Sequence, residues 1–143
     1  YSKYLTGREG YVKVVFGQSY AVLRHAKAAV VNSGTASLET ALIGTPQVVA
    51  YKGAEINFVI AKQIIKIRFI SLGNLILNRM CFRELLQYYF TSDNVLQEVR
   101  RMIEDNEYRE TMLAGYQEIR NALGGRGASA AVAKAMIDEL GKN

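Results

Sequence analysis

The sequence has little cysteine and little proline, and it contains no long apolar run. Its one cysteine, Cys81, excludes a disulfide framework and favours a reducing compartment. Its one proline, Pro46, argues against a disordered or linker-rich chain of 143 residues. No stretch reaches the roughly 18–20 uninterrupted apolar residues of a membrane-spanning helix, and no signal-peptide pattern opens the chain. With 50% hydrophobic and 22% charged residues, a single domain around one core is expected.

Charge is distributed unevenly along the chain. Residues 1–90 carry eleven Lys or Arg against four acids, a net charge of +7, whereas residues 91–143 carry seven against nine, a net charge of −2. A basic first part suits an anionic ligand or an anionic surface. A solvated surface with a chance excess of basic residues is the alternative at this point.

Short apolar runs alternate with helix-like segments in the first part of the chain. The runs with strand character are residues 11–17, 28–32 and 46–51, and helices are predicted over residues 19–27 and 35–43. Gly44 is expected to end the second helix, whose core face is predicted at Leu38, Ala41 and Leu42. Strands that alternate with helices of this length predict parallel β-α-β units. The expected fold class is therefore α/β, with a Rossmann-like parallel sheet.

The character changes after Gly53. The patterns predict an apolar helix that runs into a short strand at residues 68–72, an irregular loop at 73–79, and helices at about 82–88, 93–105, 108–123 and 128–140. The chain is thus expected to form one partial domain over 1–143, with an α/β part to about residue 72 and a loop and helical tail from about 73 to 143.

The stretch Asn32-Ser33-Gly34-Thr35 stands where a predicted strand ends and a helix begins. In open parallel sheets, ligands bind at the carboxyl ends of the strands, next to the amino ends of the following helices. The amides of residues 33–36 (Ser33, Gly34, Thr35 and Ala36) and the two hydroxyl groups favour a diphosphate there. Glu39 lies four residues after Thr35 on the same side of the helix, where its carboxylate can accept two ribose hydroxyl groups. Gly17 and Gln18 follow the first predicted strand and could line the same edge. Together they indicate a nucleotide site.

Simpler explanations of these residues are open. Ser-Gly-Thr can be a helix cap, Glu39 can act only through the helix dipole, and Gly17-Gln18 can be a plain turn. His25 is expected at the end of a helix, in a surface role rather than as a base. Cys81 is expected to be a small buried hydrophobe rather than a nucleophile.

Two ordered motifs give the sequence a family resemblance. The stretch "SGTASLETALIGTPQVVAY" resembles the nucleotide-sugar motif of GT-B glycosyltransferases, and more narrowly that of lipid-A-disaccharide synthases. The second stretch, "FISLGNLILNRMCFRELLQ", resembles a segment of the same family, with Gly73 in place of its usual Pro and Met80 in place of its usual acid. The resemblance covers essentially the whole chain. Since the chain begins with Tyr1 rather than Met, we expect a C-terminal portion cut from a longer enzyme, incomplete at the start of its own domain.

The resemblance implies a step of bacterial lipid A and lipopolysaccharide biosynthesis. The donor would be UDP-diacylglucosamine and the acceptor a diacylated glucosamine 1-phosphate, joined with inversion at the anomeric carbon. Asn74 and Arg79 would help the departing UDP, while the catalytic base would come from the absent N-terminal domain. The fragment alone would then bind UDP weakly and turn over nothing. No metal or other cofactor is expected, because the three Asp residues (93, 105 and 138) are scattered through the tail and form no D-x-D cluster.

The expected location is the cytoplasm. Segment 54–69 adds a further candidate partner, because its apolar and basic residues could dock on an anionic membrane, peripherally on the inner membrane. They could equally be buried against the absent domain or a second copy in a homodimer. Another GT-B transferase, a UDP-sugar epimerase domain, or a non-catalytic α/β module that binds a membrane or partner are the alternatives. Nucleic-acid binding is disfavoured, because the basic residues are scattered and no aromatic strip accompanies them.

Overall fold

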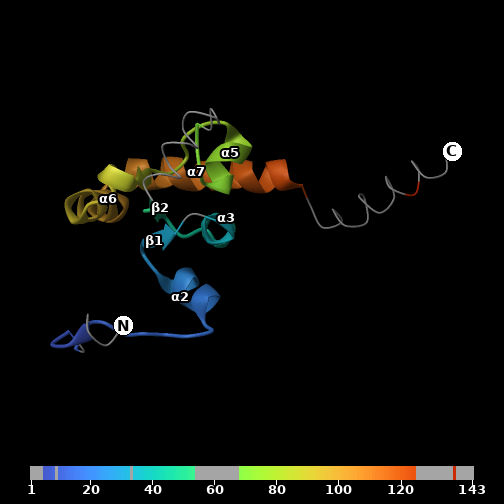
Figure 1. Cartoon of the computed structure of the whole chain (residues 1–143). Coiled ribbons are helices and arrows are strands. Elements are labelled where there is room, and N and C mark those ends of the chain that lie inside the picture. Colours follow the sequence, from blue (N-terminus) through green and yellow to red (C-terminus); the bar gives the residue numbers. More distant parts are fainter. Residues whose placement is uncertain (1–4, 9, 33, 54–67, 125–136, 138–143) are drawn as a thin grey trace.

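The computed structural model describes residues 5–8, 10–32, 34–53, 68–124 and 137. The sheet is built from β1 (Ala29–Asn32), β2 (Gln47–Tyr51) and β3 (Glu84–Leu86). The helices are α2 (Ser19–His25), α3 (Thr35–Ile43), α5 (Leu72–Leu77), α6 (Ser92–Glu104) and α7 (Asn106–Leu123), with a 3-10 turn η1 (Gln87–Tyr89) after β3. Figure 1 shows α7 running past α5 and α6, with α2 on the side of β1 away from α7.

The three strands are parallel and follow one another in the order β1-β2-β3. Asn32 is level with Ala50, and Ala50 with Leu85, so the carboxyl ends of the strands share one edge of the sheet. The central strand β2 is buried from Gln47 to Ala50, as expected for a parallel strand covered on both faces. The predicted α/β class with a parallel sheet is confirmed, as are the strands near residues 28–32 and 46–51.

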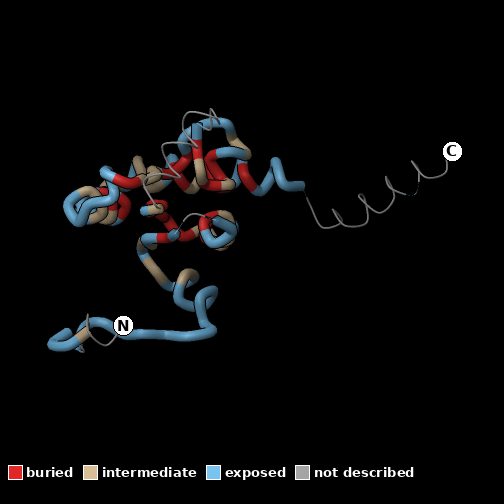
Figure 2. The backbone as a smooth tube through the Cα atoms, in the orientation of Figure 1, coloured by how far each residue is buried: buried red, intermediate tan, exposed pale blue. Residues whose placement is uncertain are grey.

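The core lies between the sheet and helix α7. Tyr116 and Phe82 meet edge to face, with ring centroids 6.0 Å apart. The Tyr116 hydroxyl donates to the Thr45 carbonyl at 3.2 Å, which ties α7 to the start of β2. Figure 2 shows the buried residues concentrated in this layer.

The predicted amphipathic helices at 93–105 and 108–123 are confirmed as α6 and α7. Each begins with a side-chain cap: Thr91 accepts a hydrogen bond from the backbone N–H of Asn94, and Asp105 accepts one from the backbone N–H of Tyr108.

Helix α3 is confirmed, and its predicted core face is right in part. Ala41 is buried and Leu38 packs half-buried against the core, whereas Leu42 is exposed. The other buried residues of the helix are Ser37 and Thr40. The two hydroxyl groups satisfy themselves within the helix, because Ser37 Oγ donates to the Gly34 carbonyl and Thr40 Oγ1 to the Ala36 carbonyl, each at 2.7 Å. Small polar side chains can therefore face the interior without an unpaired group. Gly44 ends the helix in the left-handed conformation, with φ of 96°, as predicted.

The strand predicted over residues 11–17 is wrong. This segment is extended or turned and wholly exposed, and none of the described strands pairs with it. In Figure 1 it lies away from the sheet, and in Figure 2 it is coloured as exposed. Its alternating pattern supplies strand propensity, but a strand needs a neighbour to satisfy its backbone groups.

The chain between residues 68 and 90 also differs from the prediction. The expected strand at 68–72 is absent, the expected loop at 73–79 is largely helix α5, and the helix expected at 82–88 is β3 followed by η1. β3 pairs with β2, so the sheet extends into the part of the chain expected to be a loop and helical tail. Most of the predicted helices at 54–67 and 128–140 lie outside the described residues.

Candidate functional site

The amino end of α3 stands at the carboxyl edge of the sheet, directly after β1. Its cap residue, Gly34, has φ of 134°, a backbone conformation that only glycine adopts readily, and a Cβ there would meet nothing within 4 Å. The glycine is therefore required by the turn and not by crowding. Gly34, Thr35 and Ala36 are all exposed, and the first turn carries no acidic residue. A helix end of this kind favours an anion such as a diphosphate. The remaining predicted residue, Ser33, lies outside the described residues.

A hollow of about 490 Å³ lies against α3 at Glu39, and Gly34, Thr35 and Ala36 do not line it. It is lined by residues of two segments: 17–21, which includes Gly17 and Gln18, and Glu39 of α3. The structure thus brings together three predicted nucleotide-site residues that are about twenty positions apart in the sequence. Glu39 is half-buried and lies one helical turn from Thr35.

Tyr20, a residue that the sequence motifs did not single out, also lines this hollow. The Glu39 carboxylate raises the pKa of the Tyr20 phenol, chiefly through a hydrogen bond and further through its charge. Tyr20 and Glu39 thus line the same hollow from α2 and α3. The available signal in the sequence was an aromatic residue two positions after Gln18, within the helix predicted over residues 19–27.

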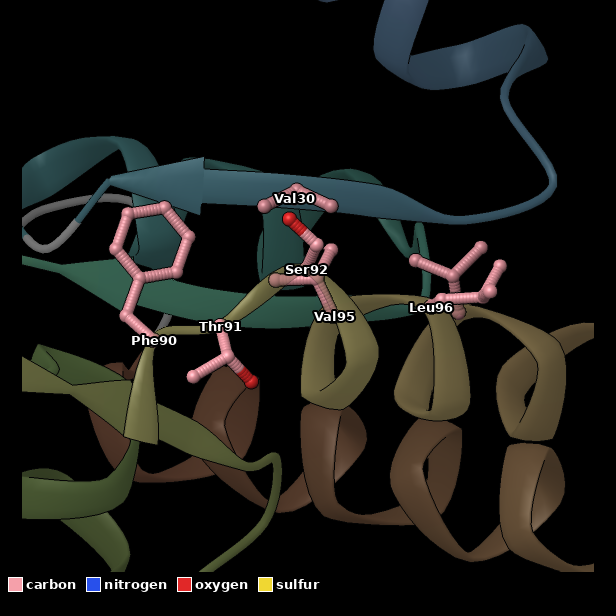
Figure 3. A pocket seen from close by; sticks show the side chains of 7 residues that line it. Val30, Phe90, Thr91, Ser92, Val95 and Leu96 are labelled. Carbon is pink, nitrogen blue, oxygen red and sulfur yellow. The ribbon is translucent and has the colours of Figure 1, made fainter. Parts of the chain in front are cut away.

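A second hollow of about 550 Å³ lies between β1 and α6 (Figure 3). Apart from Thr91 and Ser92, its lining is apolar: Val30, Phe90, Val95, Leu96 and Val99. Among the described residues, no charged side chain lines it to balance a diphosphate. The hollow beside α3 is the better candidate for a nucleotide.

Asn74 is fully buried, and its side-chain amide is occupied within the protein. Its Nδ2 donates to the Phe82 carbonyl at 2.9 Å and to Glu84 Oε1 at 2.8 Å. Its Oδ1 accepts from the backbone N–H groups of Cys81, at 2.8 Å, and Phe82, at 3.3 Å. These bonds hold the turn before β3 in place. They favour a positioning role for Asn74, while the predicted contact with departing UDP stays a prediction.

The Glu84 carboxylate completes this arrangement. It accepts from the backbone N–H of Ile70 at 2.9 Å, from the backbone N–H of Ser71 at 3.1 Å and from the Ser71 hydroxyl at 2.5 Å. A carboxylate at this position stabilises the amino end of α5 through the helix dipole. Glu84 was noted in the sequence as part of the second family motif, but its capping role depends on a partner fourteen residues away.

Arg79, the other residue predicted to help the leaving group, is half-exposed after α5. Its Nη2 donates to Glu118 Oε1 of α7 at 2.6 Å, and this bond is the main reason that the pKa of Arg79 is raised. The guanidinium is already paired, so contact with a ligand requires it to share or leave Glu118. Its predicted role is untested by this geometry.

In the described part of the chain, no three His, Cys, Asp or Glu side chains gather closely enough to hold a metal ion. Nor does any helix within the described ranges have the length and apolar character needed to cross a bilayer.

The fold and the sheet edge define an open parallel α/β domain, a class that binds ligands beyond the carboxyl ends of its strands. Comparison with known proteins narrows this class. The family model described as "Lipid-A-disaccharide synthetase" matches residues 7–136. The chain belongs to this family, as the two sequence motifs had indicated.

Individual relatives agree with this assignment. The lipid-A-disaccharide synthase of Acidobacterium capsulatum is 37% identical over 116 residues, which cover 81% of this chain and 29% of that protein. The synthase of Myxococcus xanthus is 38% identical over 127 residues, which cover 89% of this chain and 33% of that protein. The synthase of Solibacter usitatus is 33% identical, with 90% and 34% covered. The chain thus spans about a third of the length of these relatives.

Proposed function

We propose that this chain supplies the donor-nucleotide site of a lipid-A-disaccharide synthase. The observation that carries the proposal is the hollow beside α3, where Gly17 and Gln18 meet Glu39 one helical turn from the exposed amino end of the helix. The family membership supports the resemblance described above, which implies a UDP-sugar donor, so UDP is the nucleotide to test.

The diphosphate and the ribose of UDP each have a matching group in this proposal. The diphosphate lies against the amides of Gly34, Thr35 and Ala36, where the positive end of the α3 dipole offsets its charge. The ribose lies one turn farther along, where the Glu39 carboxylate accepts its two hydroxyl groups. This order keeps the carboxylate away from the phosphates, which it would otherwise repel.

The proposed reaction transfers 2,3-diacylglucosamine from UDP to 2,3-diacylglucosamine 1-phosphate, with inversion and without a metal ion. UDP leaves with developing negative charge on its diphosphate, so backbone amides, Thr35 and Arg79 stabilise the transition state. Deprotonation of the acceptor hydroxyl requires a base. We assign that base to a part of the enzyme outside these 143 residues. This chain alone is therefore expected to bind UDP and to catalyse no sugar transfer.

Calorimetric titration of the chain with UDP tests the proposal, with Glu39→Gln as the variant. Hydrogen bonds to a charged group contribute roughly 1.5–3 kcal/mol each, so the variant should bind UDP at least about tenfold more weakly. Glu104→Gln, at an exposed acid in the last turn of α6, is the matched control. Absence of UDP binding to the unmodified chain, or equal binding by Glu39→Gln, overturns the assignment.

Membrane docking and self-association are further parts of this proposal. The segment that suggested them, residues 54–69, is almost entirely outside the described residues. They are therefore proposed on the sequence alone, with a peripheral place on the inner membrane in the cytoplasm. Flotation with anionic liposomes decides the first, since Lys62→Glu together with Lys66→Glu should abolish an electrostatic association.

A further inference from the structure

Tyr20 is a large aromatic side chain that the protein core does not use. It is 60% exposed, and α2, the helix that carries it, buries none of its residues. An aromatic ring left in water forgoes the stabilisation that burial would give. The ring nevertheless stands on the wall of the hollow that contains Glu39.

We propose that Tyr20 is a specificity-determining residue of the nucleotide site, whose ring packs against the base while its hydroxyl orients the Glu39 carboxylate. The inference rests on the proposed function and deepens it by naming the residue that recognises the base. The ligand class is a nucleoside diphosphate.

The chemistry of the carboxylate allows both contacts at once. An ionised carboxylate accepts about four hydrogen bonds, so Glu39 can take the Tyr20 hydroxyl and two ribose hydroxyl groups together. In this proposal a bond from Tyr20 holds the carboxylate rotamer before the ligand arrives, which lowers the entropic cost of binding. Tyr20 therefore acts on the ribose through Glu39 and on the base directly.

The other residues of the hollow suit the edge of a base. Gly17 has φ of 70° and a Cβ there would meet nothing within 4 Å, so its backbone is open to a close approach. The Gln18 side-chain amide carries both a donor and an acceptor, as the edge of a pyrimidine does. The Tyr20 ring can therefore stack on the face of a base, while the polar groups of residues 17–18 bind the edge of the same base.

Titrations of this chain with UDP and with inorganic pyrophosphate separate the base from the phosphates. Base-aromatic stacking is lost on alanine substitution, so Tyr20→Ala should weaken UDP binding about tenfold or more and leave pyrophosphate binding unchanged. Tyr20→Phe keeps the ring and loses only the hydroxyl, so a loss of a few-fold is expected. Tyr11→Ala, at a similarly exposed tyrosine outside the hollow, should change neither.

The outcomes distinguish this inference from the proposed function. If Glu39→Gln weakens UDP binding and Tyr20→Ala does not, Tyr20 plays no part in recognition and the proposed function stands. If Tyr20→Ala weakens pyrophosphate and UDP equally, its effect is structural and the inference is wrong. If the unmodified chain binds no UDP, both fail. Because α2 buries no residue, Tyr20→Ala and Tyr20→Phe should melt at the temperature of the unmodified chain, which a thermal scan checks.

Discussion

Gly115 of α7 lies so close to Cys81 that a Cβ on the glycine would overlap the cysteine Sγ. The helix and the turn before β3 are therefore in contact without room for a methyl group. This approach fixes α7 against the segment that carries Asn74 and Glu84, and through it against the sheet.

Gly115→Ala should consequently destabilise the protein. Overpacking a filled core costs typically 1–3 kcal/mol, which outweighs the helix propensity that alanine adds. Urea unfolding measures the loss. Cys81→Ala in the same chain makes room and should recover most of it, whereas Gly10→Ala, at an open position, should change little. Equal stability of Gly115→Ala and the unmodified chain would contradict the packing.

Stability should fall above about pH 9. Burial raises the pKa of the Cys81 thiol from 9.0 to about 11, so in this interval the unfolded chain loses a proton that the folded chain keeps. Deprotonation then favours the unfolded state, by up to about 1.4 kcal/mol for each pH unit. Burial also raises the pKa of Tyr108 and Tyr116, whose ordinary value is 10.0, so they add to the loss at higher pH.

Unfolding free energies measured across pH 8–11 check this sequence of events. Cys81→Ala should delay the onset of the fall by about one pH unit, because the tyrosines remain. The two chains are compared by the pH at which the free energy of unfolding begins to fall. Its absolute value is not compared, because the substitution also changes packing. An unchanged onset would mean that the thiol is not the group responsible.

Asn74→Ala should lower stability and leave the nucleotide site unchanged. The substitution leaves the buried N–H groups of Cys81 and Phe82 unpaired, and each such group costs about 1–3 kcal/mol. A loss of roughly 2–4 kcal/mol in the free energy of unfolding is expected, with UDP affinity unchanged in the folded fraction. The opposite pattern, weaker UDP binding at unchanged stability, would support the direct contact predicted from the sequence.

Substitutions at Arg79 and Glu118 distinguish a structural role of their ion pair from a role of Arg79 in UDP binding. Both side chains are about half-exposed, so their ion pair should contribute less than about 1 kcal/mol to stability. Arg79→Gln should therefore weaken UDP binding if Arg79 stabilises the diphosphate, while Glu118→Gln frees the guanidinium and should strengthen it. Equal UDP affinity in all three chains would remove Arg79 from the site.

The sequence predicted those elements whose pattern is local. β1, β2, α3, α6 and α7 follow from apolar periodicity, and Gly44 marks its helix end because few other residues adopt its backbone conformation. The turn at Gly34 and the placement of Glu39 one turn after Thr35 are local in the same way. They could therefore be predicted before the structure was known.

What escaped prediction depends on distant partners. The stretch Glu84-Leu85-Leu86 favours a helix locally, yet it becomes β3 because β2 offers it backbone hydrogen bonds. Helix α5 begins at Leu72 because Glu84 accepts from Ile70 and Ser71, which no local pattern reveals. Tyr20 could not be predicted as a site residue, because the hollow that it shares with Glu39 forms only where α2 packs beside α3.

The most direct test of the central claim is a nuclear magnetic resonance titration of the isotope-labelled chain with UDP. The account predicts that the amide signals of residues 17–20 and 34–36 shift together with UDP concentration, and that Glu39→Gln suppresses these shifts. Shifts confined to the apolar hollow between β1 and α6, or no shift at either segment, would contradict it.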